Sequence, residues 1–80
     1  MENTIMAAFK SNLKQLMLEK SVKVGHVVTQ TEVSEQTKLS PPTIARWYQS
    51  NINKIEIETV SKLLNYFDCK FDDLVQYVED

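Results

Sequence analysis

Residues 29–47 read TQTEVSEQTKLSPPTIARW, and this stretch contains two helix starts that lie eleven residues apart. At the first, the Thr29 hydroxyl can accept a hydrogen bond from the backbone amide of Glu32, and the Glu32 carboxylate can accept one from the backbone amide of Thr29. This arrangement is called a capping box. At the second, Ser40 is a good N-cap, and Pro41 occupies the first helical position, where its missing N–H is harmless. Two helices separated only by a tight turn predict a helix-turn-helix.

Outside this stretch, apolar residues recur at the three- and four-residue spacing of amphipathic helices. Before it, the residues that share one face are Ile5, Phe9, Leu13, Leu16 and Met17. After it, two apolar series follow, namely Val60, Leu63, Leu64 and Phe67, and then Phe71, Leu74, Val75 and Val78. We therefore expect five helices, at about residues 4–20, 29–37, 41–49, 56–67 and 71–78. The predicted fold class is a compact all-α, five-helix structure, with residues 1–80 forming a single domain.

The segment VKVGHVV, residues 22–28, contains four valines and the only glycine of the chain. One structure that fits is a short hairpin, with Gly25 and His26 at its centre and Gly25 supplying the positive φ. The other is an extended loop. An isolated hairpin of this length is only marginally stable, so the loop is favoured.

The composition is typical of one small globular domain. Hydrophobic residues make up 42% of the 80 residues, and the small numbers of glycines and prolines argue against a turn-rich all-β fold. Cys69 is the only cysteine, so no internal disulfide can form. No apolar run approaches the roughly 20 residues of a membrane span, and the N-terminus lacks the basic region of a signal peptide. We therefore expect a cytoplasmic protein with no membrane contact.

The titratable residues form no pattern that is typical of catalysis or metal binding. His26 has no second histidine or nearby cysteine with which to bind a metal, and its distance from Cys69 gives no support to a catalytic pair. Four carboxylates near the C-terminus are not interpreted as an acid–base pair. Asp72 and Asp73 are interpreted as charges at the start of a helix, and Glu79 and Asp80 as part of a terminal tail. The sequence therefore predicts a protein that is not an enzyme and that needs no cofactor or metal ion.

Charge is distributed unevenly along the chain, although the formal net charge is only −2. Residues 1–54 contain seven Lys and Arg against four Glu, whereas residues 55–80 contain two Lys against seven Asp and Glu. The first region is therefore positive and the second is strongly negative. A polyanion should prefer the first two-thirds of the chain.

The stretch at 29–47 resembles the helix-turn-helix of the Cro and phage-repressor-like (XRE-type) family. Three flanking segments are similar to other helices of that family: NLKQLM at 12–17 to the first, ETVSKLLNYF at 58–67 to the fourth, and FDDLV at 71–75 to the fifth. The resemblance covers most of residues 12–78, and its specificity comes from the joint order and spacing of these pieces.

The resemblance implies that the helix at about 41–49 lies in the major groove of double-stranded DNA, while the preceding helix crosses the backbone. The implied contacts are Gln30 to phosphate at the start of the second helix, Thr43 and Arg46 to base edges, and Gln49, Ser50, Asn51 and Lys54 to the adjacent backbone. Thr31 and Pro42 are assigned to the same DNA-binding surface. Three departures from the family concern this region. Lys38 stands where glycine is usual, and Ser50-Asn51 stands where Asn-Gly is usual. Pro41 and Pro42 stand where many members carry polar residues that read bases, and because proline cannot donate, their rings can at most touch a thymine methyl.

Arg46 supports the same interpretation on physical grounds. It is three positions from Thr43, so the two share a face away from Ile44 and Trp47, which we expect to pack inward. Arg46 is the only arginine in the chain, and a guanidinium can bond guanine O6 and N7 together, a contact that is worth ~1–3 kcal/mol of discrimination. A surface ion pair is the alternative role for Arg46, and DNA contact is favoured.

These observations predict a sequence-specific transcriptional regulator, namely a repressor that acts by occupying its site. The alternative is a protein-interaction module on the same fold, an antitoxin or accessory factor, which would dock through the acidic half at residues 55–80. One recognition helix offers few side chains that can contact base edges, which limits sequence discrimination. We therefore also expect a weak homodimer that binds two-fold symmetric DNA. The favoured interface is the predicted last helix at 71–78, and the segment at 22–28 is the second candidate.

Overall fold

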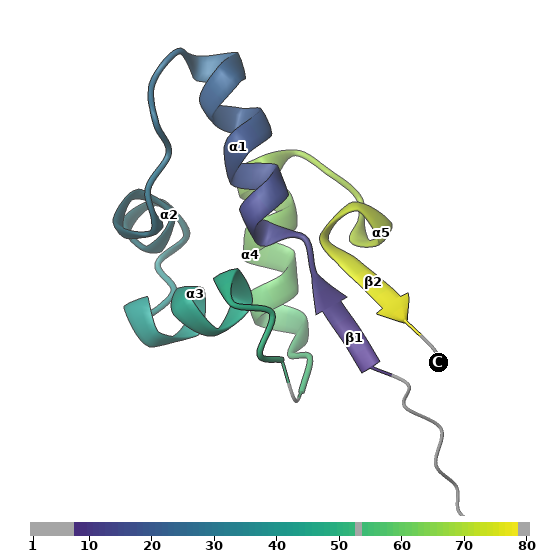
Figure 1. The fold of residues 1–80 in the computed structure, drawn as a ribbon. Helices are drawn as coiled ribbons and strands as arrows, with labels where there is room; N and C mark the ends of the chain where they lie inside the picture. Colours follow the sequence, from purple (N-terminus) through teal and green to yellow (C-terminus); the bar gives the residue numbers. More distant parts are fainter. Residues whose placement is uncertain (1–7, 53, 79–80) are drawn as a thin grey trace, which may run out of the picture.

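A computed structural model describes residues 8–52 and 54–78 of the protein. Within these residues there are five helices, namely α1 (Leu13–Val24), α2 (Gln30–Thr37), α3 (Pro41–Tyr48), α4 (Ile57–Phe67) and α5 (Phe71–Leu74). Two strands, β1 (Ala8–Ser11) and β2 (Val75–Val78), pair antiparallel (Figure 1). The predicted all-α class with five helices is therefore confirmed, and the small sheet is a minor addition.

The two helix starts at Thr29 and Ser40 form as the sequence predicts. The Thr29 hydroxyl accepts a hydrogen bond from the Glu32 amide at 3.1 Å, and the Ser40 hydroxyl accepts one from the Thr43 amide at 3.3 Å. The reciprocal half of the capping box is absent from the hydrogen bonds of the described residues. The Glu32 carboxylate instead contacts His26, at 3.2 Å from Nε2.

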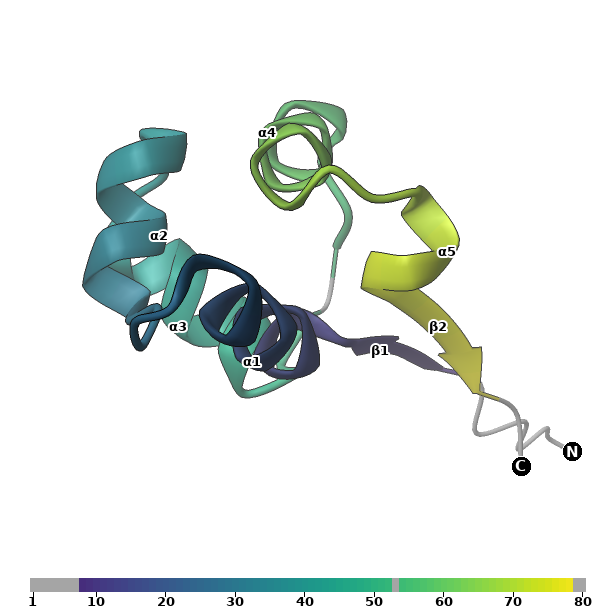
Figure 2. The same ribbon diagram turned by 90° about the horizontal axis from the view of Figure 1, so that it is seen from above.

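The helices pack around one hydrophobic core, which draws at least one residue from every helix. Its members are Leu13, Leu16, Met17, Val28, Val33, Ile44, Trp47, Val60, Leu63, Leu74 and Val75. Seen from above, α2 lies at one end of the molecule and the two-stranded sheet at the other, with α1 and α4 between them (Figure 2). The first helix of the helix-turn-helix, α2, and the sheet are thus at opposite ends of the molecule (Figure 2).

The predicted first helix is displaced along the sequence. Residues 8–11, which the apolar spacing assigned to that helix, form β1, and the helix begins only at Leu13; residues 4–7 of the predicted helix lie outside the described residues. At its other end, α1 continues to Val24 and stops at Gly25, whose φ is 82° and whose amide donates to the Ser21 carbonyl. The hairpin considered for 22–28 is therefore wrong, because Gly25 uses its positive φ to cap a helix. The segment from Gly25 to Thr29 forms neither helix nor strand and is a loop, as the favoured alternative predicted, but the loop starts later than residue 22.

The predicted last helix is also wrong in its second half. Only Phe71–Leu74 is helical, and Val75–Val78 is a strand whose partner is β1. The spacing of Leu74, Val75 and Val78 suggested a helix, but valine and tyrosine also favour a strand. Pairing with a segment more than sixty residues away decides between the two. The apolar helical face that was expected to form the dimer interface therefore does not exist.

Hydrogen bonds of Ser11 and Asn12 attach the end of β1 to the neighbouring elements. The Asn12 amide, at the start of α1, donates to the Leu74 carbonyl at 2.8 Å. The Ser11 amide, at the end of β1, donates to the hydroxyl of Ser50 in the loop after α3 at 2.8 Å. The sheet thus holds the beginning of α1 against α5 and against the end of the helix-turn-helix.

The turn between α2 and α3 is fixed by two buried hydroxyl groups of α2. The Ser34 hydroxyl donates to the Leu39 carbonyl at 2.6 Å. The Thr37 hydroxyl donates to the Val33 carbonyl at 2.6 Å and accepts from the Leu39 amide at 3.3 Å. Between them, Lys38 adopts a φ of 63°, in the left-handed region. At the position where the family that the sequence resembles usually has glycine, this protein therefore has lysine. The left-handed backbone conformation at this position is unfavourable for a residue with a Cβ atom.

We predict that Lys38→Gly stabilises the fold by about 0.5–1 kcal/mol. A left-handed conformation costs a residue with a Cβ roughly 1–2 kcal/mol, and the larger unfolded-state entropy of glycine offsets part of the gain. Urea denaturation followed by Trp47 fluorescence measures the change. Lys38→Ala is the control, because it removes the charge and keeps the Cβ. Equal stabilities of the two variants would show that backbone strain at this position is negligible.

Candidate nucleic-acid interface

The orientation of α3 is set by its buried face. Ile44 is 0% and Trp47 is 4% exposed, which confirms that Trp47 packs into the core. Thr43 is half-buried at the border of this face, and Arg46 is exposed. Arg46 makes no ion pair with any described residue, so the surface ion-pair alternative has no partner within that part of the chain.

One groove runs between α3 and the start of α4 and contains four of the predicted site residues. These are Thr43, Arg46, Asn51 and Lys54, and the lining is completed by Trp47, Ile52, Glu56 and Thr59. The groove is small, about 60 Å³, and its walls carry mainly polar groups. It can hold an anion or a base edge against α3, but it is too small for an organic cofactor.

The charge of this groove is only weakly positive. Arg46 and Lys54 contribute two cations, but Glu56 lies in the same lining, with its carboxylate 3.6 Å from the Lys54 ammonium. Both members of that pair are exposed, so solvent screens the interaction and it is worth little. Lys54 can therefore exchange Glu56 for a phosphate at small cost.

A second groove lies on the other side of α3, between the starts of α2 and α3. It measures about 360 Å³ and contains three more of the predicted site residues, Gln30, Thr31 and Pro42. Pro41 and Ala45 complete its walls. The sequence interpretation considered the Pro41 ring beside Pro42 but did not include Ala45, although positions 41 and 45 are one helical turn apart and therefore share a face.

Gln49 and Ser50 lie outside both grooves. Gln49 is the exposed C-cap of α3. Ser50 is half-buried, and its hydroxyl accepts the hydrogen bond from the Ser11 amide. The structure therefore gives Ser50 a role in joining the sheet to the loop after α3, and its oxygen is already occupied in part.

The start of α2 presents free backbone donors. The amides of Glu32 and Val33 bond to the side chain and carbonyl of Thr29. The amides of Gln30 and Thr31, the first two residues of the helix, donate to no acceptor among the described residues. Free N–H groups and the positive end of the helix dipole together favour an anion at this end of α2.

The start of α3 differs in this respect, because no backbone amide there is available. Pro41 and Pro42 have no N–H. The next two amides, of Thr43 and Ile44, donate to the hydroxyl and the carbonyl of Ser40. The Ser40 and Thr43 hydroxyls also bond to each other at 2.8 Å. The general expectation that a helix start offers donors to phosphate therefore applies to α2 and does not apply to α3.

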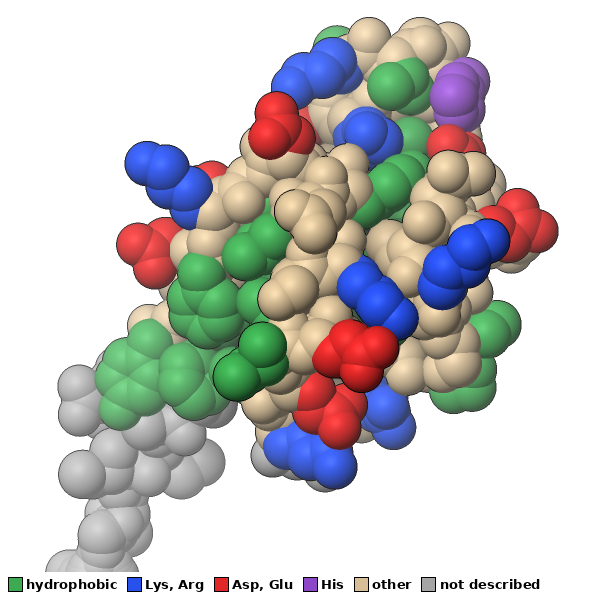
Figure 3. Space-filling model, turned by 180° about the vertical axis from the view of Figure 1, so that it is seen from behind, with side chains coloured by type: hydrophobic (Ala, Val, Ile, Leu, Met, Phe, Trp, Pro, Cys, Tyr) green, Lys and Arg blue, Asp and Glu red, His purple; other side chains and the backbone are tan. Residues whose placement is uncertain are grey.

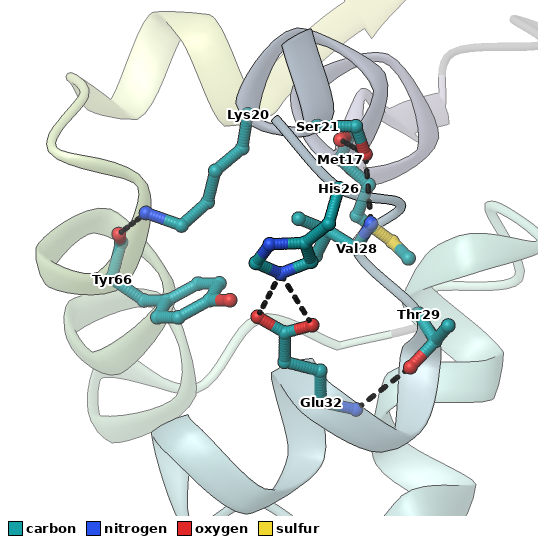
Figure 4. Close-up of polar contacts among 8 residues, drawn as sticks. All are labelled: Met17, Lys20, Ser21, His26, Val28, Thr29, Glu32 and Tyr66. Carbon is teal, nitrogen blue, oxygen red and sulfur yellow. Dashed lines mark hydrogen bonds and ion pairs between the residues drawn. The ribbon is translucent and has the colours of Figure 1, made fainter. Parts of the chain in front are cut away.

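Behind α2, four side chains from α1, the loop after it, α2 and α4 lie together (Figure 4). Glu32 contacts His26, and the Tyr66 hydroxyl points toward Glu32 without forming a hydrogen bond to any described residue. The Lys20 ammonium bonds the Tyr66 carbonyl at 3.2 Å and lies 4.5 Å from the centre of its ring. Burial, and after it the negative charge of Glu32, raises the pKa of Tyr66. Burial and the neighbouring carboxylate therefore both disfavour deprotonation of this tyrosine.

The described residues contain neither a metal-ligating cluster nor a thiol with a lowered pKa. Among them, no group of three or more His, Cys, Asp or Glu is placed to hold a metal ion. The Cys69 thiol is half-buried, and burial raises its pKa, with further contributions from Asp73, Asp68 and Glu19. A thiol with a raised pKa is a poor nucleophile. None of the described helices has the length and apolar character that crossing a bilayer requires.

Comparison with known proteins identifies one family. The family model of the Cro/C1-type HTH DNA-binding domain matches residues 12–80. The match includes both grooves and all five helices, and it leaves out only β1 and the residues before it. No curated protein and no solved structure matches the chain.

We predict that Tyr66→Phe leaves the free energy of unfolding unchanged or raises it by up to about 1 kcal/mol. The buried hydroxyl has no hydrogen-bond partner in the described structure, and an unsatisfied buried polar group costs roughly 1–3 kcal/mol, whereas phenylalanine keeps the ring packing. Urea denaturation measures the difference, and Tyr77→Phe, whose hydroxyl is on an exposed residue, is the control. A loss of more than about 1 kcal/mol in Tyr66→Phe alone would show that the hydroxyl bonds to Glu32 in solution.

Proposed function

Because the chain belongs to the Cro/C1-type HTH DNA-binding domain family, we propose that it is a sequence-specific transcriptional regulator that binds double-stranded DNA through α3. The observation that carries this proposal is Arg46, an exposed guanidinium on α3 without an ion-pair partner among the described residues. A planar guanidinium in the major groove can bond both acceptors of guanine. Family membership supports DNA binding itself, and Arg46 supports the reading of sequence.

In this proposal the two grooves beside α3 have different roles. The α3–α4 groove places Thr43 and Arg46 against base edges, and Asn51 and Lys54 against the neighbouring phosphates. On the other side, the free amides of Gln30 and Thr31 hold a phosphate at the start of α2. Phosphate contacts fix the register of the protein on the duplex, and base contacts specify the sequence.

We further propose that residues 1–80 act as one cytoplasmic domain and that regulation is repression. A protein that only occupies a site can block transcription by excluding other proteins from it. The groove beside α3 carries at most one excess positive charge, which supports weak non-specific binding and a larger share of the affinity from specific contacts.

The second candidate function is a protein-interaction module on the same fold. The observation that favours it is a wide groove of about 480 Å³ between α1 and the α4–α5 turn, which contains the carboxylates of Glu19, Asp68, Asp72 and Asp73. A basic partner protein could bind there. Retention on duplex DNA at moderate salt separates the two functions, because a module that only binds protein would not be retained.

We predict that Arg46→Ala weakens binding to a duplex selected from a random pool about 10- to 100-fold more than it weakens binding to random DNA. Loss of a bidentate guanine contact removes ~1–3 kcal/mol of discrimination. Fluorescence anisotropy titrations with both duplexes measure the two affinities.

Lys54→Ala is the matched control for this experiment, because it removes one exposed cation of the same groove. Lys54→Ala should weaken both complexes equally. It should also lower the slope of log affinity against log salt concentration by about one released counterion or less. Equal losses on the two duplexes in Arg46→Ala would instead make Arg46 a phosphate contact.

Homodimer formation remains part of the proposal, with its surface moved to the sheet. Exposed apolar side chains gather over the sheet (Figure 3), where Phe9 and Tyr77 pack against each other across the strands with their ring centres 5.4 Å apart. A two-stranded sheet also has unpaired outer edges that a second copy can extend. Two protomers would then place their α3 helices about one helical turn, ~34 Å, apart on DNA.

We predict that two protomers bind the selected duplex and that Tyr77→Lys weakens the second binding step by at least tenfold. Val22→Lys, at an exposed valine of the other surface considered, should have no effect. Sedimentation equilibrium of each variant with the duplex gives the stoichiometry. A single protomer that saturates the duplex, or an effect of Val22→Lys alone, would reject the sheet as the interface.

A further inference from the structure

The groove between the starts of α2 and α3 has hydrocarbon walls, although it adjoins the residue that we assign to base recognition. Its α3 side consists of the rings of Pro41 and Pro42 and the methyl group of Ala45. Among the described residues that line it, none is charged, and its polar members, Gln30 and Thr31, both belong to α2. The α3 wall therefore has no side chain that can donate a hydrogen bond.

The backbone does not supply a donor there either. As described above, the two prolines remove the first two amides of α3, and Ser40 accepts from the next two. The hydroxyls of Ser40 and Thr43 are bonded to each other. A phosphate or a carboxylate would consequently lose its hydration at this wall without gaining a hydrogen bond, which is unfavourable.

We infer that this groove receives the C5 methyl group of a thymine and that it makes the protein selective for a 5-methylpyrimidine. The inference rests on the proposed DNA-binding function. On the major-groove edges of the base pairs, the C5 methyl of thymine is the apolar group that projects among the hydrogen-bond donors and acceptors. That methyl is therefore the major-groove feature that matches an apolar wall, and its burial against proline rings and an alanine is favourable.

The position of the thymine follows from the helix. Pro42 and Arg46 are four residues apart on α3 and are therefore neighbours on its surface. A base pair whose methyl group enters the groove lies next to the base pair that Arg46 contacts. The free amides of Gln30 and Thr31, on the opposite wall, can bind a phosphate of the same DNA strand. This contact would position the methyl group in the groove.

An apolar side chain of a partner protein is the other occupant that the walls would accept. The DNA occupant is favoured because the groove shares α3 with Arg46, because it borders free α2 amides that suit a phosphate, and because the chain belongs to a DNA-binding family. A protein occupant predicts no dependence of DNA affinity on the methyl group.

The test uses the full chain and a duplex selected from a random pool. Each thymine is replaced in turn by deoxyuridine, which removes only the C5 methyl, and affinity is measured by anisotropy. We expect a loss of about fourfold, the equivalent of roughly 0.8 kcal/mol for one buried carbon, at a thymine that adjoins the base pair read by Arg46. In a duplex with cytosine at that position, 5-methylcytosine should bind about fourfold more tightly than cytosine.

Pro42→Ala provides the protein side of the test, because it removes a ring from the wall and keeps a residue that the helix tolerates. It should reduce the difference between thymine and deoxyuridine, whereas Asn65→Ala, an exposed neutral change on α4, should retain it in full. If a selected sequence shows no methyl dependence, or the same dependence in Pro42→Ala, the inference is overturned while the proposed function stands. If no sequence is selected at all, both fail, because methyl recognition is itself a sequence preference.

Discussion

The arrangement of the DNA-binding face depends on one turn, at Lys38 and Leu39. Two buried hydroxyls of α2 hold both backbone polar groups of Leu39, so the chain can leave α2 in only one direction. This direction places Ile44 and Trp47 in the core, and their burial in turn leaves Arg46 outside. The left-handed backbone at Lys38 is a local cost of the turn, and the hydrogen bonds of Ser34 and Thr37 offset it.

Local signals predicted the helix-turn-helix correctly because they act within one turn of a helix. A hydroxyl at Thr29 or Ser40 reaches an amide three residues away, and the proline at position 41 fits only the start of a helix. The two strands were missed for the opposite reason. The spacing of the apolar residues at 71–78 is compatible with a helix, and the stabilising partner of Val75–Val78 is β1, at the other end of the chain.

The sequence predicted which residues of the candidate site lie close together, but it did not predict all of their hydrogen bonds. Positions 43, 46, 51 and 54 do lie in one groove, and 30, 31 and 42 lie in another, although whether they contact DNA remains a prediction. The resemblance to the family could not show that the Ser50 hydroxyl accepts a hydrogen bond from the Ser11 amide, because that bond depends on the formation of β1. Nor could it show that no backbone donor is free at the start of α3. That property follows from the combination of two prolines with a serine cap whose oxygens accept from both following amides.

The bond between Ser11 and Ser50 also bears on how a dimer would read DNA. It joins β1 directly to the loop that follows the recognition helix, and β1 pairs with the strand that carries Tyr77. The exposed apolar surface of the sheet and the outward face of α3 are therefore connected through a few short, hydrogen-bonded segments and not through a long linker. Two recognition helices can match half-sites at a fixed spacing of ~34 Å only if each is held rigidly relative to the dimer interface. The sheet, although a minor part of the fold, meets this requirement, because it carries the proposed interface and fixes the end of the helix-turn-helix at the same time.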